Sequence, residues 1–142
     1  MNILFFLTPK TDVAYLYDHY TVAKALETIW TSNYTALPMI NREGKYMGTI
    51  TEGDFLWGLL EHHDITPDNI HKLKVGELPR RVQHKPVSVS ANMEDLLTTA
   101  KDQNFVPVVD DNKVFIGIVT RKDILQYCYD SMEGRTKLQQ GA

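Results

Sequence analysis

The sequence predicts an α+β protein made of two β-α-β-β-α repeats that pack sheet to sheet about an approximate twofold axis. The first observation is internal similarity, because GIVTRKD at 117–123 repeats GTITEGD at 48–54. The second is that Pro38 and Pro107 are separated by the same offset. The third is size, since a unit of about 50 residues buries too little apolar surface to be stable alone. The two copies are therefore expected to share an interface.

Each repeat is predicted to begin with a short extended segment, at 14–17 and at 87–89, and to continue into an amphipathic helix. Apolar residues in both copies recur with helical spacing. These residues are Val22, Ala25, Leu26 and Ile29 in the first copy, and Met93, Leu96, Leu97 and Ala100 in the second.

A β-hairpin and a second helix are predicted to complete each repeat. The proline-containing strands are expected at 37–40 and 106–109, and each precedes a polar loop suited to a hairpin. The returning strand leads into Thr-x-x-Asp and a helix, expected at 55–62 or 124–129.

These elements divide the chain into two repeats, a linker and a tail. We expect the first repeat at 1–65, the linker at 66–82 and the second repeat at 83–134. Residues 135–142 have no periodic apolar face, so we expect a flexible tail there.

Composition excludes several functional classes. With 15 Lys and Arg against 18 Asp and Glu, the net charge is −3, so no large basic surface is available for nucleic acid. The lone Cys128 and five scattered histidines show no metal-ligand spacing, and no catalytic grouping of side chains is visible. The N-terminal apolar stretch is too short for a signal peptide or a membrane span. We therefore expect a cytoplasmic protein with no metal and no enzymatic activity.

The Thr-x-x-Asp pairs have an ordinary interpretation as helix caps. A Thr hydroxyl at the N-cap accepts a hydrogen bond from the first turn, while an acidic side chain three residues later reaches back to the N-cap N–H. The same helix start is also suited to binding a phosphate. Arg121 and Lys122 favour the second interpretation, because cations oppose the helix dipole at an N-terminus. Glu52 in the first copy would repel an anion, so the second copy is predicted to be the stronger site.

The repeated pattern resembles the CBS domain, a family named after cystathionine β-synthase. The features that carry the resemblance are the tandem β-α-β-β-α units, the strand proline and the Gly-[apolar]-x-Thr-x-x-Asp ending of each copy. The second copy, FVPVVDDNKVFIGIVTRKDIL, matches more closely than the first, ALPMINREGKYMGTITEGDFL. The resemblance covers about residues 8 to 130, and we expect a free-standing CBS pair (a Bateman module).

This resemblance implies a regulatory module that binds AMP, ATP, S-adenosylmethionine or cyclic di-AMP in clefts between its repeats, and forms a flat dimer. The implied phosphate and ribose contacts are Thr51, Asp54, Thr120, Arg121, Lys122 and Asp123, with Gly48 and Gly117 allowing close approach. The implied base contacts are Ala14, Tyr15, Leu16, Thr35, Ala36, Leu37, Pro38, Lys85, Pro86, Val87, Phe105, Val106 and Pro107. Which extended segment accompanies which Asp is left open.

Aromatic and apolar segments suggest a homodimer. We expect Trp30, Phe55 and Trp57 in the core, and the FLWGLL segment at 55–60 is apolar nearly all round. That segment and the N-terminal ILFFL at 3–7 are expected to face a second chain. The alternative function is a ligand-free homodimeric interaction scaffold in which both Thr/Asp pairs only cap helices. The regulated partner is not identifiable.

Overall fold

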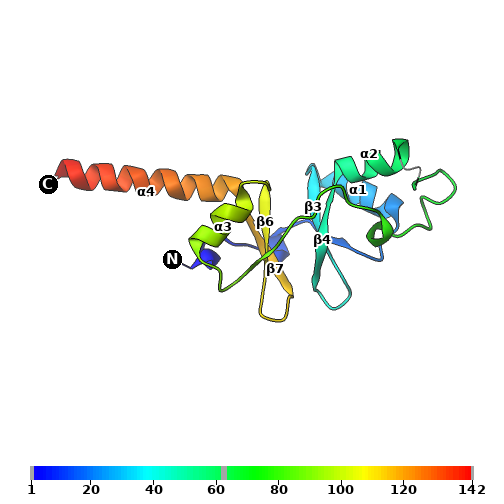
Figure 1. Cartoon of the computed structure of the whole chain (residues 1–142), viewed down its shortest axis with the longest axis horizontal. Coiled ribbons are helices and arrows are strands. Elements are labelled where there is room, and N and C mark those ends of the chain that lie inside the picture. The colour runs from blue at the N-terminus through cyan, green and yellow to red at the C-terminus, as the bar shows by residue number, and fades with distance from the viewer. Residues whose placement is uncertain (1, 62–63, 142) are drawn as a thin grey trace.

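Two β-sheets lie side by side at the centre of the molecule, with helices on their outer sides (Figure 1). The computed structural model describes the backbone of residues 2–61 and 64–141, and the side chains of 2–61 and 64–133. The predicted α+β architecture of two β-α-β-β-α repeats is confirmed by the order of the elements.

The two repeats contain equivalent elements. The first repeat consists of β2 (Leu16–Tyr17), α1 (Val22–Ser32), β3 (Ala36–Ile40), β4 (Tyr46–Thr51) and α2 (Glu52–Leu60). The second consists of β5 (Val87–Ser88), α3 (Met93–Ala100), β6 (Phe105–Val109), β7 (Phe115–Thr120) and α4 (Arg121–Gly141). Short segments precede each repeat: η1 (Ile3–Phe6), β1 (Thr8–Pro9) and η2 (Lys10–Asp12), and later η3 (Val75–Glu77).

The sheets repeat one pairing scheme. In the first sheet, β2 pairs in parallel with β3, and β3 pairs antiparallel with β4. In the second sheet, β5, β6 and β7 pair in the same way, and β1 adds a fourth strand antiparallel to β7. A register shift follows Met39 in β3 and Val108 in β6, so even the irregularity is repeated.

Each repeat completes its core with chain from outside its own sequence range. Ile3, near the N-terminus, is fully buried in the core of the second repeat. Val75 and Leu78, from the linker, are buried in the core of the first repeat. This exchange ties the two repeats together, because neither apolar core is complete without the segment that leads into the other.

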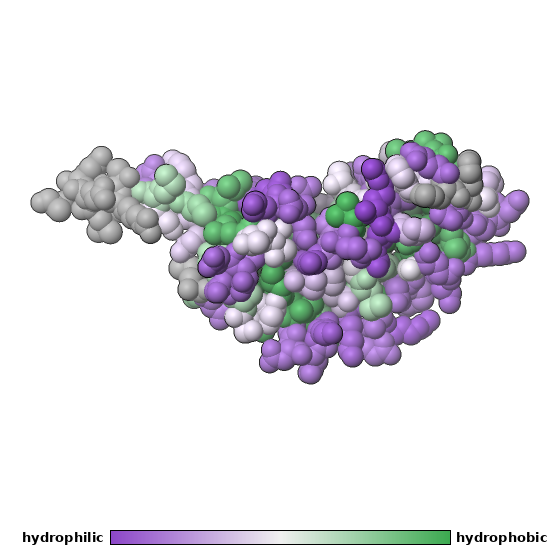
Figure 2. All heavy atoms as spheres, viewed as in Figure 1, coloured by the Kyte–Doolittle hydropathy of each residue, from purple (hydrophilic) through white to green (hydrophobic). Residues whose placement is uncertain are grey.

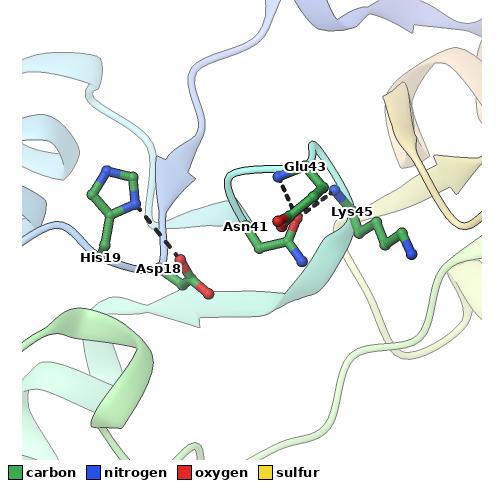
Figure 3. A network of polar contacts seen from close by, with 5 residues as sticks. All are labelled: Asp18, His19, Asn41, Glu43 and Lys45. Carbon is green, nitrogen blue, oxygen red and sulfur yellow. Dashed lines mark hydrogen bonds and ion pairs between the residues drawn. The ribbon is translucent and has the colours of Figure 1, made fainter.

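An asparagine or aspartate side chain shapes each hairpin loop. The Asn41 Oδ1 atom accepts hydrogen bonds from the backbone N–H groups of Glu43, at 3.0 Å, and Lys45, at 2.9 Å (Figure 3). Asp110 holds the second loop in the same way. Such local acceptors stabilise tight turns. Figure 3 also shows His19 beside Asp18, with 3.7 Å between Nδ1 and Oδ1.

The two hairpins meet on the approximate twofold axis. The Tyr46 N–H donates to the Lys113 carbonyl at 3.2 Å, and the equivalent Phe115 N–H donates to the Gly44 carbonyl at 2.9 Å. Gly44 and Lys113 both have positive φ angles, 81° and 66°. These two equivalent hydrogen bonds show that the backbones of the two repeats are related by the predicted twofold axis.

Two expectations about apolar residues need correction. Phe55 is buried as expected, but Trp30 is 83% exposed and Trp57 is only half-buried. Trp30 lies on the outer face of α1, where helical spacing alone cannot separate a core position from its neighbour.

The helix predicted to end at Tyr129 continues to Gly141, so the backbone of 135–141 is helical. The other predicted helix end, His62, lies outside the described residues.

Candidate functional site

An apolar cavity of about 360 Å³ lies between the two repeats. The first repeat and the chain that leads into it contribute one wall, and β6 and β7 of the second repeat contribute the other. The lining residues are Thr8, Asp12, Val13, Ala14, Asn33, Tyr34, Thr35, Ala36, Leu37, Pro38, Asn104, Phe105, Ile118 and Thr120. The size and the mainly apolar lining suit a small molecule with a flat ring system.

A smaller, polar cavity of about 280 Å³ occupies the position related by the twofold axis. It is lined by Thr35, Ala36, Thr51, Glu52, Gly53, His84, Asp102, Asn104 and Phe105. Thr35, Ala36, Asn104 and Phe105 line both cavities, so the two are neighbours across a shared wall.

The cavities show which segments accompany which Thr. Ala14 and the Thr35–Pro38 segment, which includes the start of β3, meet Thr120 of the second repeat in the apolar cavity. In the polar cavity, His84 and Phe105 meet Thr51 of the first repeat. Each site therefore combines the base-side segments of one repeat with the Thr of the other, a pairing that the sequence left open.

Several predicted contact residues do not line either cavity. Leu16, Val87 and Val106 are buried in the two apolar cores, and Pro107 is also buried. Tyr15 packs against Phe115 and Tyr17, with ring centroids 6.4 and 5.7 Å away. Lys85 and Pro86 are exposed, and the Lys85 backbone is held by Gln103 through bonds of 2.9 and 3.2 Å.

In the first repeat, Thr51 and Asp54 form the complete capping box. The Asp54 N–H donates to the Thr51 hydroxyl at 3.2 Å, and the Thr51 N–H donates to the Asp54 carboxylate at 2.9 Å. The other oxygen of Asp54 accepts the backbone N–H of Arg81 at 2.9 Å, and the side chain is only 2% exposed. The Asp54 carboxylate is thus engaged by the protein and does not line the polar cavity.

In the second repeat, the corresponding carboxylate is more accessible. The Asp123 N–H donates to the Thr120 hydroxyl at 3.1 Å, but no described residue donates a hydrogen bond to the Asp123 carboxylate. Asp123 is half-buried and lines a third cavity beside the N-terminal segment, which includes Thr8. Thr8 also lines the apolar cavity, so Asp123 lies close to that site without lining it.

Arg121 corrects the electrostatic reasoning from the sequence. Its Nε and Nη2 atoms donate to the Ala100 carbonyl at 3.3 and 3.0 Å, and Nη2 also donates to the Lys101 carbonyl at 3.3 Å. These carbonyls lie at the C-terminus of α3, where a cation is favoured by the helix dipole. Arg121 therefore has a structural role that its own helix does not reveal, while Lys122 is exposed to solvent.

The two predicted glycines approach protein backbone or side chains. At Gly117, with φ 156°, a Cβ atom would fall on the Thr8 carbonyl of the adjacent strand β1. At Gly48, with φ 142°, it would lie 2.6 Å from the Arg80 guanidinium. Both glycines are explained by the chain that crosses them, and their contact with a ligand remains a prediction.

Burial perturbs the pKa of Tyr46, the first residue of β4. Desolvation raises the pKa of Tyr46 to about 12, although a hydrogen bond to Thr49 and the charge of Arg80 act in the opposite direction. The oxygen atoms of Tyr46 and Thr49 are 2.7 Å apart. The Tyr46 hydroxyl also donates to the His84 carbonyl at 3.4 Å, which ties this core position to the polar cavity.

Some site residues were not predicted from the sequence. They include Thr8, Asp12, Val13, Asn33, Tyr34 and Ile118 in the apolar cavity, Gly53, His84 and Asp102 in the polar cavity, and Arg81 beside Asp54. One signal would have found part of this set. Leu7 and Leu78 are 71 residues apart, as are the equivalent helix residues Val22 and Met93. This offset aligns Thr8-Pro9-Lys10 with Pro79-Arg80-Arg81.

Within the described residues, no group of three or more His, Cys, Asp or Glu side chains is arranged to hold a metal ion. None of the helices in that same part of the chain has the length and apolar character needed to cross a membrane.

Comparison with known proteins gives two matches to one family profile. The CBS domain profile matches residues 6–61 and residues 75–130. CbpB from Listeria monocytogenes, solved in complex with c-di-AMP, is 23% identical with a TM-score of 0.80, over 92% of this chain and 97% of that one. CBSX2, solved in complex with AMP, is 24% identical with a TM-score of 0.72, over 92% and 98% of the two chains.

Curated relatives are much longer proteins. The A-adding tRNA nucleotidyltransferase of Aquifex aeolicus is 33% identical over 118 residues, which make up 83% of this chain and 13% of that protein. The chain spans 13 to 22% of the length of the curated relatives that it matches.

Proposed function

The chain belongs to the CBS domain family, and we propose that it is a regulatory module that binds an adenine nucleotide between its two repeats. The observation that carries this proposal is the apolar cavity, which brings Ala14 and the Thr35–Pro38 segment against Thr120. The complexes of CbpB with c-di-AMP and of CBSX2 with AMP support an adenine-containing ligand.

In this proposal, the adenine ring lies in the apolar cavity between Ala14, Leu37 and Ile118. Thr35 and Ala36 line the same cavity and are the proposed contacts for the polar atoms of the ring. The ribose hydroxyls donate to the Asp123 carboxylate, which no described residue occupies. Asp54 is a poorer partner for a ribose because it already accepts two backbone N–H groups and is buried.

The regulatory step is a population shift between relative arrangements of the repeats. A ligand in a cavity with walls from both repeats favours the arrangement that fits it, and a partner protein responds to that arrangement. The module itself is non-catalytic in this scheme. Its partner and the identity of the adenosine derivative remain to be found by experiment.

We also propose that the module forms a homodimer. Leu56, Leu59 and Leu60 of α2 are 60, 45 and 63% exposed, and hydrophobic atoms lie on the surface over α2 (Figure 2). Phe5, in the N-terminal segment, is also highly exposed. Apolar side chains grouped on one helix are characteristic of an interaction surface. Analytical ultracentrifugation of the protein and of Leu56→Glu tests this, since a monomeric wild type would contradict it.

The same exposed residues are also compatible with the alternative function, a ligand-free dimeric scaffold, which experiment can test. Calorimetry with AMP, ADP, ATP, S-adenosylmethionine, c-di-AMP and NAD decides between the two functions. Under the nucleotide proposal, at least one of these compounds binds, and Asp123→Ala weakens its binding at least tenfold while leaving the ligand-free protein folded. If none binds at millimolar concentration, the scaffold is the better description.

A further inference from the structure

We propose that a shallow groove between the N-terminal segment and α4 is a docking site for an arginine-containing segment of a partner protein. The groove has a volume of about 360 Å³. It shares Thr8 with the apolar cavity and no lining residue with the polar cavity. The docking goes beyond the proposed function, because it does not require a nucleotide.

The groove combines carboxylates with aromatic rings. Asp123 and Asp130 line it from α4, and its described lining residues include no Lys, Arg or His. Phe6 and Tyr127 line it as well, and their rings pack edge to face with centroids 4.8 Å apart. A guanidinium suits this combination, because it pairs with carboxylates and packs against aromatic rings.

The protein itself does not neutralise either carboxylate. No described residue donates a hydrogen bond to the Asp123 carboxylate, and Asp130 accepts one bond, at 3.0 Å, from the Gln126 amide. No ion pair joins either aspartate to a cation within the described residues. A segment that brings N–H donors and positive charge would therefore form charge-assisted hydrogen bonds in this groove.

The first repeat shows how such a segment is bound. Asp54 and Trp57 occupy the positions of Asp123 and Gln126, each 69 residues earlier in the sequence. The linker residue Arg81 donates its backbone N–H to the Asp54 carboxylate at 2.9 Å. The Arg81 guanidinium carbon lies 4.3 Å from the centre of the Trp57 ring. One arginine thus contacts α2 with its backbone and with its side chain.

The second repeat presents the equivalent helix positions without an equivalent arginine. Lys10, which aligns with Arg81, lies over the Tyr15 ring at 5.2 Å and does not line the groove. Asp123 therefore lacks the backbone donor that Asp54 has. Because Arg81 uses its backbone N–H as well as its guanidinium, the equivalent occupant is a peptide segment rather than a free polyamine.

Docking at Asp123 would couple the groove to nucleotide binding. Asp123 is the proposed acceptor for the ribose hydroxyls, so a nucleotide and a docked segment compete for one carboxylate. Competition of this kind is reciprocal, since each ligand lowers the affinity for the other by the same factor. This coupling, unlike the docking, rests on the proposed function.

A peptide copied from the first repeat is the probe. The acetylated and amidated peptide LPRRVQ, the sequence of residues 78–83, is titrated into the nitrogen-15-labelled protein while NMR follows the backbone amide shifts. We expect saturable shifts at 5–8 and 123–130. Arg81→Gln in the peptide should weaken binding by about fivefold or more, whereas the matched control Arg80→Gln should change it by less than about twofold.

Asp130→Asn tests the protein side of the contact. It should weaken peptide binding by about threefold or more, because a charged acceptor is lost from an exposed position where the fold does not need it. Asp111→Asn, at the exposed tip of the second hairpin, removes the same charge elsewhere and should preserve binding. Equal affinity in Asp130→Asn and the wild type overturns the docking site, as does the absence of saturable shifts at millimolar peptide.

Two further measurements distinguish other occupants. Spermine that produces the same shifts as the peptide, with similar affinity, overturns the assignment to a peptide segment. In analytical ultracentrifugation, a dimer that dissociates in Asp130→Asn while the peptide fails to bind also overturns it, because the groove would then hold a second copy of this chain.

Titration with AMP separates the docking from the proposed function. If AMP binds and the peptide does not, the docking site fails and the proposed function stands. If the peptide binds and no adenine nucleotide does, the docking site stands and the proposed function fails. If both bind, saturating AMP should weaken peptide binding by about fivefold or more, and an unchanged affinity overturns the coupling through Asp123.

Discussion

Replacing Arg121 by Gln tests whether this cation stabilises the fold or binds a ligand. The guanidinium makes three hydrogen bonds of 3.0 to 3.3 Å to the Ala100 and Lys101 carbonyls. Bonds from a charged donor contribute about 1.5–3 kcal/mol each when short and buried. These are long and the side chain is half-buried, so we expect a total loss of about 1–2 kcal/mol. For a chain of this size, that corresponds to a fall in thermal midpoint of about 3–8 °C.

Urea unfolding followed by tryptophan fluorescence measures this loss, and calorimetry on the same samples measures affinity for AMP or c-di-AMP. Arg121→Gln should unfold at lower urea concentration and bind nucleotide within about twofold of the wild type. Lys122→Gln is the matched control, since Lys122 is exposed and makes no described hydrogen bond, and its stability should not change. The reasoning is refuted if Arg121→Gln keeps full stability and loses nucleotide binding, because the cation would then act on the ligand.

Three other predictions test the site and the twofold axis. Asp54→Ala should lower the free energy of unfolding by about 2–4 kcal/mol, because two backbone N–H groups lose their acceptor. Asp123→Ala should lower it by less than about 1 kcal/mol. Equal losses in urea unfolding would contradict this difference. The pKa of Tyr46 is raised to about 12 in the folded protein, against about 10 in the unfolded chain. The neutral side chain therefore contributes its full stabilisation below pH 10. The free energy of unfolding falls by an amount on the order of 2–3 kcal/mol as the pH rises from 10 to 12. Tyr46→Phe should remove that alkaline loss, and a wild-type midpoint that stays constant to pH 12 would oppose it. Lys113→Gly should stabilise the protein by up to about 1 kcal/mol, because glycine adopts a positive φ angle without strain. A lower thermal midpoint in this variant would mean that the Lys113 side chain stabilises the fold by more than the strain destabilises it.

The fold was predictable because the repeat supplies its own comparison. Positions that agree between the copies, such as Pro38 with Pro107, reveal the strand order without any reference structure. The segments that cross between repeats were not predictable in this way. Ile3 and Val75 have no local periodicity that shows which core they enter, because their partners are distant in sequence. Trp30 shows the same limit, since an apolar residue on an amphipathic helix can lie just outside the buried face.

The candidate site was predictable in composition and less so in the role of each side chain. Thr35 and Phe105, which the family resemblance implied as base contacts, line the cavities, and their contact with a ligand stays a prediction. The role of Arg121 could not be derived from its own helix, because the carbonyls that it binds lie at the C-terminal end of α3, 20 and 21 residues earlier. The difference between Asp54 and Asp123 was hidden for a similar reason. Their sequence contexts are alike, but a linker residue reaches only Asp54.

These contrasts indicate how a duplicated fold acquires two unequal sites. The capping role of Thr-x-x-Asp is kept in both copies because each helix needs it, so these residues alone do not distinguish a binding site from a helix start. The segments that lead into the repeats are free to diverge, and they differ at the points that touch the sites: Arg81 binds Asp54 and Trp57, whereas Lys10 lies over Tyr15. One copy is left with an accessible carboxylate beside an apolar cavity, and the other with a guanidinium beside an open helix turn. A ribose donates hydrogen bonds and needs a free acceptor, so under the proposed function the Asp123 carboxylate is better suited to it than the Asp54 carboxylate, which already accepts two backbone N–H groups.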